Sequence, residues 1–173
     1  MKNIYLVGFM GTGKTTVGKI LAEKLNKEFV EMDDVIEERE SRSIVDIFAQ
    51  NGEPYFRNLE KQLLKELAKE SDLIVSCGGG LICDEENSKI LKKTGIIFNL
   101  VATPLTIYER TKKYTHRPLL NVDDPLEKIK ELLEKRRPYY EKVHFNIDTE
   151  KFSAEEVAEE IVKIIRSHPE IVS

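Results

Sequence analysis

The sequence predicts an α/β fold in which a five-stranded, mostly parallel sheet carries helices on both faces. Short apolar segments alternate along the 173 residues with segments whose apolar side chains recur at helical spacing. This alternation is typical of parallel sheets whose strands are joined by helices. The length suits one domain spanning residues 1–173. Ligands of such folds bind at the carboxyl ends of the strands, where we therefore expect the functional residues.

The expected strands are short buried runs, and the helices between them carry capping and breaking signals. We expect strands at 3–7, 29–33, 73–77, 96–101 and 143–148. We expect helices at 14–25, 43–50, 53–69, 84–93, 104–113, 126–140 and 154–166. Ser43 and Ser153 are the expected N-caps, and Asn51-Gly52 is expected to separate the second helix from the third.

Composition narrows the classes of partner and compartment. The net charge of -4 argues against a nucleic-acid partner, which would favour a clustered basic face. No apolar run approaches the roughly 18 residues that cross a bilayer, and no targeting leader precedes the first strand. Cys77 and Cys83 lack metal-ligand spacing, so we expect two reduced thiols. These features predict a cytoplasmic protein without a membrane partner, and we expect a monomer.

The segment from Gly8 to Thr15 follows the first expected strand and matches the phosphate-binding pattern G-x-x-x-x-G-K-[ST]. Its glycines let successive backbone N–H groups face one concave space, to which the following helix N-terminus adds positive potential. Lys14 can reach the β- and γ-phosphates of ATP, and the Thr15 hydroxyl can bind Mg²⁺. The expected nucleotide-binding residues here are Gly11, Thr12, Gly13, Lys14, Thr15 and Thr16.

A phosphate-binding loop alone does not distinguish kinases from other nucleotide hydrolases. GTPases also use an N-K-x-D motif to recognise the base, and the sequence contains none. Larger nucleotide hydrolases need switch regions for which 173 residues leave little room. These observations favour a small kinase.

Acidic residues close the second expected strand, which we expect to lie next to the strand of the phosphate-binding loop. Because strand side chains alternate between faces, Glu31 and Asp33 are expected on one side, while Asp34 points away or caps the next helix. One of the two carboxylates can hold Mg²⁺ through a bound water, and the other can accept a proton from a hydroxyl nucleophile. An acidic cap for the following helix is the alternative, which suits Asp34 better than Asp33.

Three further segments carry arginines near the expected active edge. Arg57 can fork onto a carboxylate, or it can form a surface ion pair. The polar stretch at 112–124 has the length of a lid, and Arg117 within it can reach the phosphates. Arg136 and Arg137 close a helix, where they suit the helix dipole or supply a second anion contact.

Gly78, Gly79 and Gly80 follow the third expected strand. Three successive glycines cost backbone entropy, and they allow a backbone to approach a ligand closely. A plain flexible turn is the alternative. The strand itself ends without an acidic residue, and Ser76 is its polar candidate.

Taken together, these motifs resemble shikimate kinase in order and over nearly the whole chain. The family shows a phosphate-binding loop, an acid-x-acid pair, G-E-x-x-F-R, three glycines, R-P-L-L and R-x-P-x-Y. The matching segments are Gly8 to Thr15, Glu31 with Asp33, Gly52 to Arg57, Gly78 to Gly80, Arg117 to Leu120, and Arg136 to Tyr140. The resemblance implies that Thr15 and the residue at position 31 serve Mg²⁺. One departure is Glu31, where the family usually has Asp, although the longer side chain can still reach a water bound to Mg²⁺.

The resemblance implies a three-layer α/β/α P-loop kinase fold with a mobile lid at about 112–124 and a substrate region at about 31–61. It implies transfer of the γ-phosphate of ATP to the 3-hydroxyl of shikimate with Mg²⁺. The products are shikimate 3-phosphate and ADP, in aromatic amino acid biosynthesis.

The resemblance also implies a role for each matching residue. Asp33 would bind the ring hydroxyls and help to activate the 3-hydroxyl. Lys14 and Arg117 would stabilise the transferring phosphoryl group, and Arg110 would lie near the adenine. The residues expected to hold the shikimate carboxylate and ring are Arg57, Arg136 and the backbone at Gly78, Gly79 and Gly80.

Two alternatives remain open at this stage. One is another small-metabolite kinase of the same fold, such as a gluconate or nucleotide kinase. Gluconate kinases lack the combined G-E-x-x-F-R and R-x-P-x-Y motifs, and nucleotide kinases need a base pocket. The other is a binding module that holds a nucleotide without turnover. The presence of the residues expected for catalysis argues against it, namely Lys14, Thr15, Asp33 and Arg117.

Overall fold

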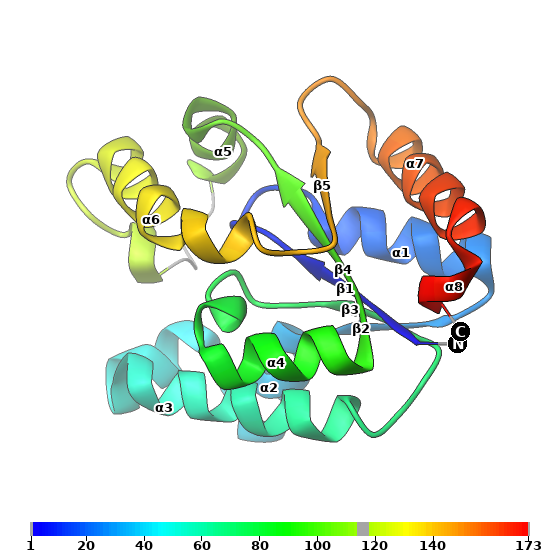
Figure 1. The fold of residues 1–173 in the computed structure, drawn as a ribbon. Helices are drawn as coiled ribbons and strands as arrows, with labels where there is room; N and C mark the ends of the chain where they lie inside the picture. The colour runs from blue at the N-terminus through cyan, green and yellow to red at the C-terminus, as the bar shows by residue number, and fades with distance from the viewer. Residues whose placement is uncertain (1, 114–117, 173) are drawn as a thin grey trace.

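The computed structural model describes residues 2–113 and 118–172, which form a parallel sheet covered by helices on both faces (Figure 1). The sheet has five strands in the order β2-β3-β1-β4-β5, and every neighbouring pair is parallel. The predicted α/β/α layers and the predicted five-stranded parallel sheet are confirmed. The strands are β1 (Asn3–Val7), β2 (Glu28–Glu31), β3 (Leu73–Ser76), β4 (Gly95–Val101) and β5 (Phe145–Asp148).

The central strand β1 is apolar on both of its faces because helices cover both faces of the sheet. Tyr5 lies opposite Val75 of β3 and Ile97 of β4, and all three side chains are fully buried. On one face of the sheet, α1 (Lys14–Leu25) packs beside α7 (Ala154–Ser167), as Figure 1 shows. The carboxyl end of β1 therefore lies in the middle of the molecule, between the helical layers.

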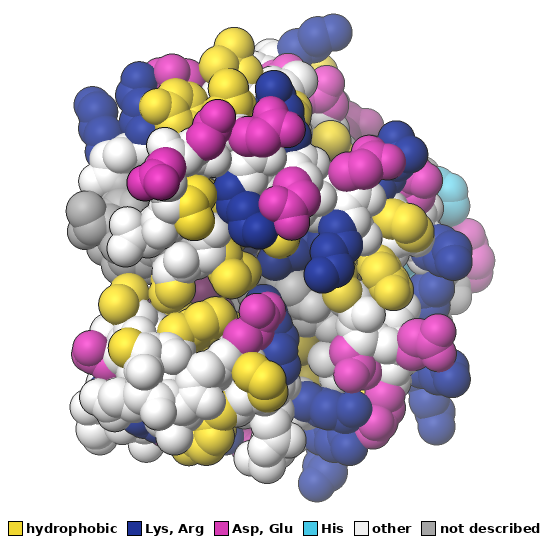
Figure 2. Space-filling view, turned by 90° about the vertical axis from the view of Figure 1, so that its left-hand side faces the viewer, with side chains coloured by type: hydrophobic (Ala, Val, Ile, Leu, Met, Phe, Trp, Pro, Cys, Tyr) yellow, Lys and Arg dark blue, Asp and Glu magenta, His cyan; other side chains and the backbone are white. Residues whose placement is uncertain are grey.

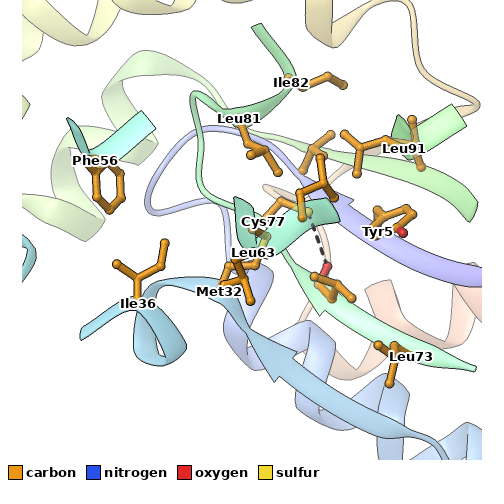
Figure 3. Packing of buried hydrophobic residues seen from close by; sticks show 14 of the residues in the cluster. Tyr5, Met32, Ile36, Phe56, Leu63, Leu73, Cys77, Leu81, Ile82 and Leu91 are labelled. Carbon is orange, nitrogen blue, oxygen red and sulfur yellow. Dashed lines mark hydrogen bonds between the residues drawn. The ribbon is translucent and has the colours of Figure 1, made fainter. Parts of the chain in front are cut away.

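The other face of the sheet is covered mainly by three helices. They are α2 (Met32–Glu40), α3 (Ile44–Leu67) and α4 (Glu85–Thr94), which lie below the sheet in Figure 1. Figure 3 shows Met32, Leu63 and Cys77 pointing into one apolar cluster on this side. Cys77 is fully buried and Cys83 is partly buried, and both are free thiols, as the sequence predicts.

A third group of elements lies over the carboxyl edge of the sheet. It comprises α5 (Pro104–Thr111), α6 (Pro125–Tyr140) and two single 3₁₀ turns, η1 (Leu81–Cys83) and η2 (Pro118–Leu120). Phe9, from the loop after β1, is buried in a small cluster with Ile107 of α5 and Ile129 of α6. This cluster fixes α5 and α6 against the phosphate-binding loop.

The predicted helix signals act where the sequence places them. The Ser43 hydroxyl accepts a hydrogen bond from the backbone N–H of Asp46, and Ser153 forms a capping box with Glu156. Inside α3, Gly52 has φ 79° and ψ 173°, so the segment is two helices joined at a kink. The predicted break at Asn51-Gly52 is therefore confirmed.

The end of the second strand is where the prediction was wrong. The structure ends β2 at Glu31 and begins α2 at Met32, so Asp33 lies in the first turn of a helix. Asp33 and Asp34 suit that turn because carboxylates stabilise a helix N-terminus. Met32 is fully buried beneath the helix. The alternation of polar and apolar residues over only four positions fits a strand end and a helix start equally well.

A short C-terminal helix, α8 (Pro169–Val172), was not predicted, because a single turn carries no periodicity. The predicted lid at 112–124 is described only in part, since residues 114–117 lie outside the described ranges. Within those ranges, we find no helix with the length and apolar character to cross a membrane.

Candidate active site

The phosphate-binding loop connects β1 to α1 at the carboxyl edge of the sheet. Gly8, Gly11 and Gly13 have φ values of 138°, 78° and 95°, which residues with side chains rarely adopt. A Cβ atom at Gly8 would lie 2.5 Å from the carbonyl oxygen of Leu100, so β4 leaves no room for one. The loop thus depends on its glycines both for conformation and for space.

The side chain of Lys14, the first residue of α1, folds back over the loop. Its Nζ donates hydrogen bonds to the carbonyl oxygens of Gly8 at 2.9 Å and Phe9 at 3.1 Å. The Thr12 hydroxyl also donates to the Phe9 carbonyl oxygen, at 2.8 Å. The ammonium group is therefore held at the loop, in front of the N-terminus of α1, where an anion is favoured.

Glu31 at the end of β2 lies next to the start of α1. It accepts a hydrogen bond of 2.6 Å from the Thr15 hydroxyl. Burial raises the pKa of Glu31, while the hydrogen bond from Thr15 opposes that rise. The glutamate that replaces the family's usual aspartate is thus long enough to contact the predicted Mg²⁺-binding threonine.

The hydroxyl oxygen of Thr15 and the carboxylate oxygens of Glu31 fit a magnesium ion that is bound together with a nucleotide. In the described ranges, no three His, Cys, Asp or Glu side chains gather into a metal site of their own. Mg²⁺ normally takes one or two protein oxygens and completes its shell with waters and substrate phosphates. Thr15 and Glu31 offer such a partial site beside the phosphate-binding loop.

Most of the predicted catalytic and substrate-binding residues line one pocket of about 190 Å³. The pocket opens between α2, α3, the glycine turn and α6, beside the phosphate-binding loop. The predicted residues that line it are Lys14, Thr15, Glu31, Asp33, Arg57, Gly78, Gly79, Gly80 and Arg136.

Asp33 reaches this pocket from a helix rather than from the predicted strand. Asp34, which was expected to point away or to cap the next helix, lies in the first turn of that helix and lines the pocket as well. The expected separation of the two carboxylates by strand alternation was therefore wrong, because both lie in the first turn of α2. The expected position of the second strand directly beside the strand of the phosphate-binding loop was also wrong, because β3 lies between β2 and β1. Both carboxylates nevertheless line the same pocket as Lys14.

Arg57 holds two acidic partners on its own helix, α3. Its Nη1 donates to Glu60 at 2.6 Å, and its Nη2 donates to Glu53 at 3.1 Å. Glu53 lies at the surface, whereas the side chain of Glu60 is only 1% exposed. Burial raises the pKa of Glu60 to about 7, against the opposing effect of the Arg57 guanidinium. Sequence reasoning did not single out Glu60, although its i,i+3 spacing from Arg57 was a usable signal.

Two of the three glycines make room for these side chains. A Cβ atom at Gly78 would lie 2.1 Å from Oε1 of Glu60, and one at Gly80 would lie 2.6 Å from Nη2 of Arg57. Neither glycine has a positive φ, so a Cβ atom at either position would act by displacing the end of the Glu60 or the Arg57 side chain. The turn therefore lets the Arg57–Glu60 pair approach the backbone closely.

Arg136 enters the pocket from α6 and is only 6% exposed. Its guanidinium carbon lies 5.2 Å from the centre of the Phe9 ring, and its Nη1 has no hydrogen-bond partner among the described residues. The Tyr140 hydroxyl, one turn further along α6, donates to the Gly79 carbonyl oxygen at 2.5 Å. Arg137, by contrast, is exposed and pairs with Glu134 at the surface.

The remaining predicted residues lie away from this pocket or outside the described ranges. Arg110 donates from Nη1 to the carbonyl oxygen of Gly11 at 3.2 Å and contacts Thr149 at 3.3 Å. It therefore lies at the outer side of the phosphate-binding loop, where Thr149 was not predicted. Thr16 is exposed in the first turn of α1. Arg117 is not among the described residues.

Comparison with known proteins shows the family of the protein that carries this arrangement of pocket residues. A sequence model of the shikimate kinase family matches residues 10–166. The chain belongs to the shikimate kinase family. It is 51% identical to the shikimate kinase of Thermodesulfovibrio yellowstonii, over 94% of each chain. It is 46% identical to that of Sulfurihydrogenibium sp., over 96% of this chain and 99% of the relative.

Solved structures agree with the family assignment. Shikimate kinase from Acinetobacter baumannii in complex with shikimate superposes with a TM-score of 0.94 at 40% identity, over 97% of this chain and 94% of the other. A gluconokinase from Sinorhizobium meliloti superposes with a TM-score of 0.61 at 17% identity, over 96% and 92% of the two chains, which shows a common fold alone.

Proposed function

We propose that the protein transfers the γ-phosphate of ATP to the 3-hydroxyl of shikimate, giving shikimate 3-phosphate and ADP. The observation that carries the proposal is one pocket in which Arg57 and Arg136 lie with Asp33 beside Lys14. Two guanidinium groups suit the carboxylate of shikimate, and a carboxylate suits its hydroxyls. The A. baumannii relative, whose structure is described as a complex with shikimate, supports the same acceptor. The reaction belongs to aromatic amino acid biosynthesis.

In the proposed transfer, the acceptor oxygen forms a bond to the γ-phosphorus. The bond from that phosphorus to the β–γ bridging oxygen breaks, and ADP leaves with its electron pair. The hydroxyl proton passes to the carboxylate of Asp33 and then to solvent. Lys14 and Arg117 stabilise the charge on the transferring group, and Arg110 lies near the adenine.

Thr15 and Glu31 would hold Mg²⁺, directly through the hydroxyl and through a bound water at the carboxylate. The ion supplies charge neutralisation for the β- and γ-phosphates. Gly11, Thr12, Gly13 and Thr16 complete the nucleotide-binding loop.

Water competes with shikimate for the γ-phosphate, so we place a lid over the two substrates at residues 112–124. Leu119 lines the acceptor pocket from the described end of that segment. Closure would bring Arg117 to the phosphates only when both substrates are bound. We further propose a cytoplasmic monomer with no nucleic-acid or membrane partner.

The test is a coupled assay of ADP release with ATP, Mg²⁺ and each of three acceptors. We expect turnover with shikimate and little with gluconate or AMP. Comparable turnover with gluconate would favour the alternative sugar-acid kinase. No turnover with any acceptor, together with measurable ATP binding, would favour the binding module.

A further inference from the structure

A second hollow of about 400 Å³ adjoins the acceptor pocket on its solvent side. It lies between α3 and α6, and four residues line both spaces: Arg57, Gly80, Leu119 and Arg136. Figure 2 looks onto this side of the molecule and shows it hollowed between an upper part and a lower part, with both basic and acidic side chains at the margin. A molecule in the outer hollow therefore has Arg57 and Arg136 at its inner wall.

The charges along this outer hollow are not balanced. Four cationic side chains line it, namely Arg57, Lys128, Lys135 and Arg136, but only two acidic ones, namely Glu53 and Glu131. Lys128 is paired with Glu131 at 3.0 Å, and Arg57 is paired with Glu53 at 3.1 Å and with the buried Glu60 at 2.6 Å. The remaining cations are Lys135, which has no ion-pair partner among the described residues, and the buried Arg136.

The opposite side of α6 provides a contrast within one helix. There a hollow between α6, β4 and β5 is lined by Lys130 and Arg137 and by Glu134 and Glu141, so its charges cancel. Lys130 is paired with Glu127 at 3.4 Å, and Arg137 with Glu134 at 2.8 Å. The unpaired positive charge thus belongs to the side of α6 that leads to the acceptor pocket.

We infer that the outer hollow is an anion-docking vestibule, and that Lys135 is a specificity residue that draws a small carboxylate toward Arg57 and Arg136. The inference rests on the proposed function, since shikimate is the carboxylate concerned. The buried Nη1 of Arg136, which lacks a partner among the described residues, marks the inner end of the path. An unpaired charge at the mouth of a low-dielectric cleft raises the local concentration of an oppositely charged ligand and the rate at which it binds.

Charge reversal at Lys135, matched by the same change at Lys130, tests the vestibule in the enzyme. We expect Lys135→Glu to lower kcat/KM for shikimate about three- to tenfold at low salt, with kcat and the KM for ATP unchanged. The loss should shrink at about 0.5 M salt because exposed charges are then screened. Lys130→Glu should stay within about a factor of two at either salt concentration.

Cys83 offers a second measurement that does not depend on turnover, because its partly buried thiol lines the same hollow. Iodoacetate is an anion and iodoacetamide is neutral, and both react with the thiolate by displacing iodide. The alkylation rates at Cys83 are followed by mass spectrometry. We expect the rate with iodoacetate divided by the rate with iodoacetamide to fall about three- to tenfold in Lys135→Glu, because the anion is then repelled, and to stay unchanged in Lys130→Glu. The fully buried Cys77 should not react.

The outcomes separate the two proposals. If the unmodified protein does not phosphorylate shikimate, the proposed function fails and the assignment of shikimate to the vestibule fails with it. If shikimate is phosphorylated but the two variants behave alike in kcat/KM and in the alkylation ratio, the vestibule alone is overturned. A lower kcat/KM for shikimate in Lys135→Glu that persists at high salt, or that comes from a lower kcat, would also contradict the vestibule.

Discussion

The phosphate-binding loop and the acceptor pocket lie side by side, yet they differ in whether their polar groups have hydrogen-bond partners within the protein. In the loop, the ammonium of Lys14 donates to the carbonyl oxygens of Gly8 and Phe9. In the pocket, Oε1 of Glu60 and Nη1 of Arg136 are buried without a hydrogen-bond partner among the described residues. The loop is thus internally satisfied, while the pocket holds buried groups that a ligand can satisfy.

This difference indicates how the two regions divide the work. A buried polar atom without a partner costs on the order of 1–3 kcal/mol, which a matching ligand recovers. The loop can serve any reaction of ATP, and the pocket selects the acceptor. Changes in the loop and its proposed closing arginine should therefore act on kcat, and changes in the pocket arginines should act on the KM for shikimate.

The largest effect is expected at Asp33, where the two regions meet. Asp33→Asn should lower kcat by roughly 10²–10⁴ because it removes the base that accepts the hydroxyl proton. Steady-state kinetics with circular dichroism as a check of folding would measure it. Asp34→Asn is the matched control on the same helical turn, and a larger loss there would exchange the roles of the two residues.

The proposed lid arginine comes next. Arg117→Ala should lower kcat by roughly 10²–10³ while the Kd for ATP changes little, because its contact forms with the transition state. Hydrogen exchange across residues 112–124, without ligand and with ADP plus shikimate, would follow the closure. Equal protection in both states and an unimpaired variant would remove the lid from the account.

Arg136 and Arg137 give the sharpest contrast within one helix. Arg136→Lys should raise the KM for shikimate by roughly 10- to 100-fold, since an ammonium cannot reproduce the planar fork of a guanidinium. Arg137→Lys makes the same change at an exposed residue and should leave the KM within a factor of two. Equal effects would mean that Arg136 acts as a surface charge.

The smallest predicted effect is a pH dependence that arises from Glu60. Burial raises the pKa of Glu60 to about 7, and the positive charge of Arg57 keeps it from rising further. A bound shikimate carboxylate would offset the charge of Arg57, so binding should raise the pKa of Glu60 further and take up a proton. The affinity for shikimate should therefore fall as pH rises through about 7, by at most about tenfold per pH unit.

Measuring the KM for shikimate from about pH 6 to 8 would test this coupling, with the KM for ATP as the internal control. Glu60→Gln should flatten the shikimate profile. A profile that keeps its slope in the variant would assign the titration to another group.

The sequence predicts the loop half of the site better than the pocket half. Gly8 to Thr15 is a contiguous motif, and its strand and helix follow from local periodicity. The β2–α2 boundary was misplaced because Glu31 to Asp34 satisfies both a strand end and a helix start, and only the burial of Met32 decides between them.

Glu60 was missed for a different reason. A glutamate inside a long amphipathic helix is ordinarily at the surface, and no local pattern shows that this one is buried. Its carboxylate occupies the space that a Cβ atom would take at Gly78, on a separate turn after β3. The contact of Arg110 with Thr149 is likewise made across distant parts of the chain. Long-range contacts of this kind require the fold.

The central claim is that the buried guanidinium of Arg136 recognises the acceptor's carboxylate. The most direct measurement compares kcat/KM for shikimate with that for its uncharged methyl ester, in the unmodified protein and in Arg136→Met. We expect the ester to lose about 30-fold or more in the unmodified protein, corresponding to about 2–5 kcal/mol, and to lose clearly less in the variant, where Arg57 alone remains to favour the acid. Equal use of acid and ester by the unmodified protein would contradict the account.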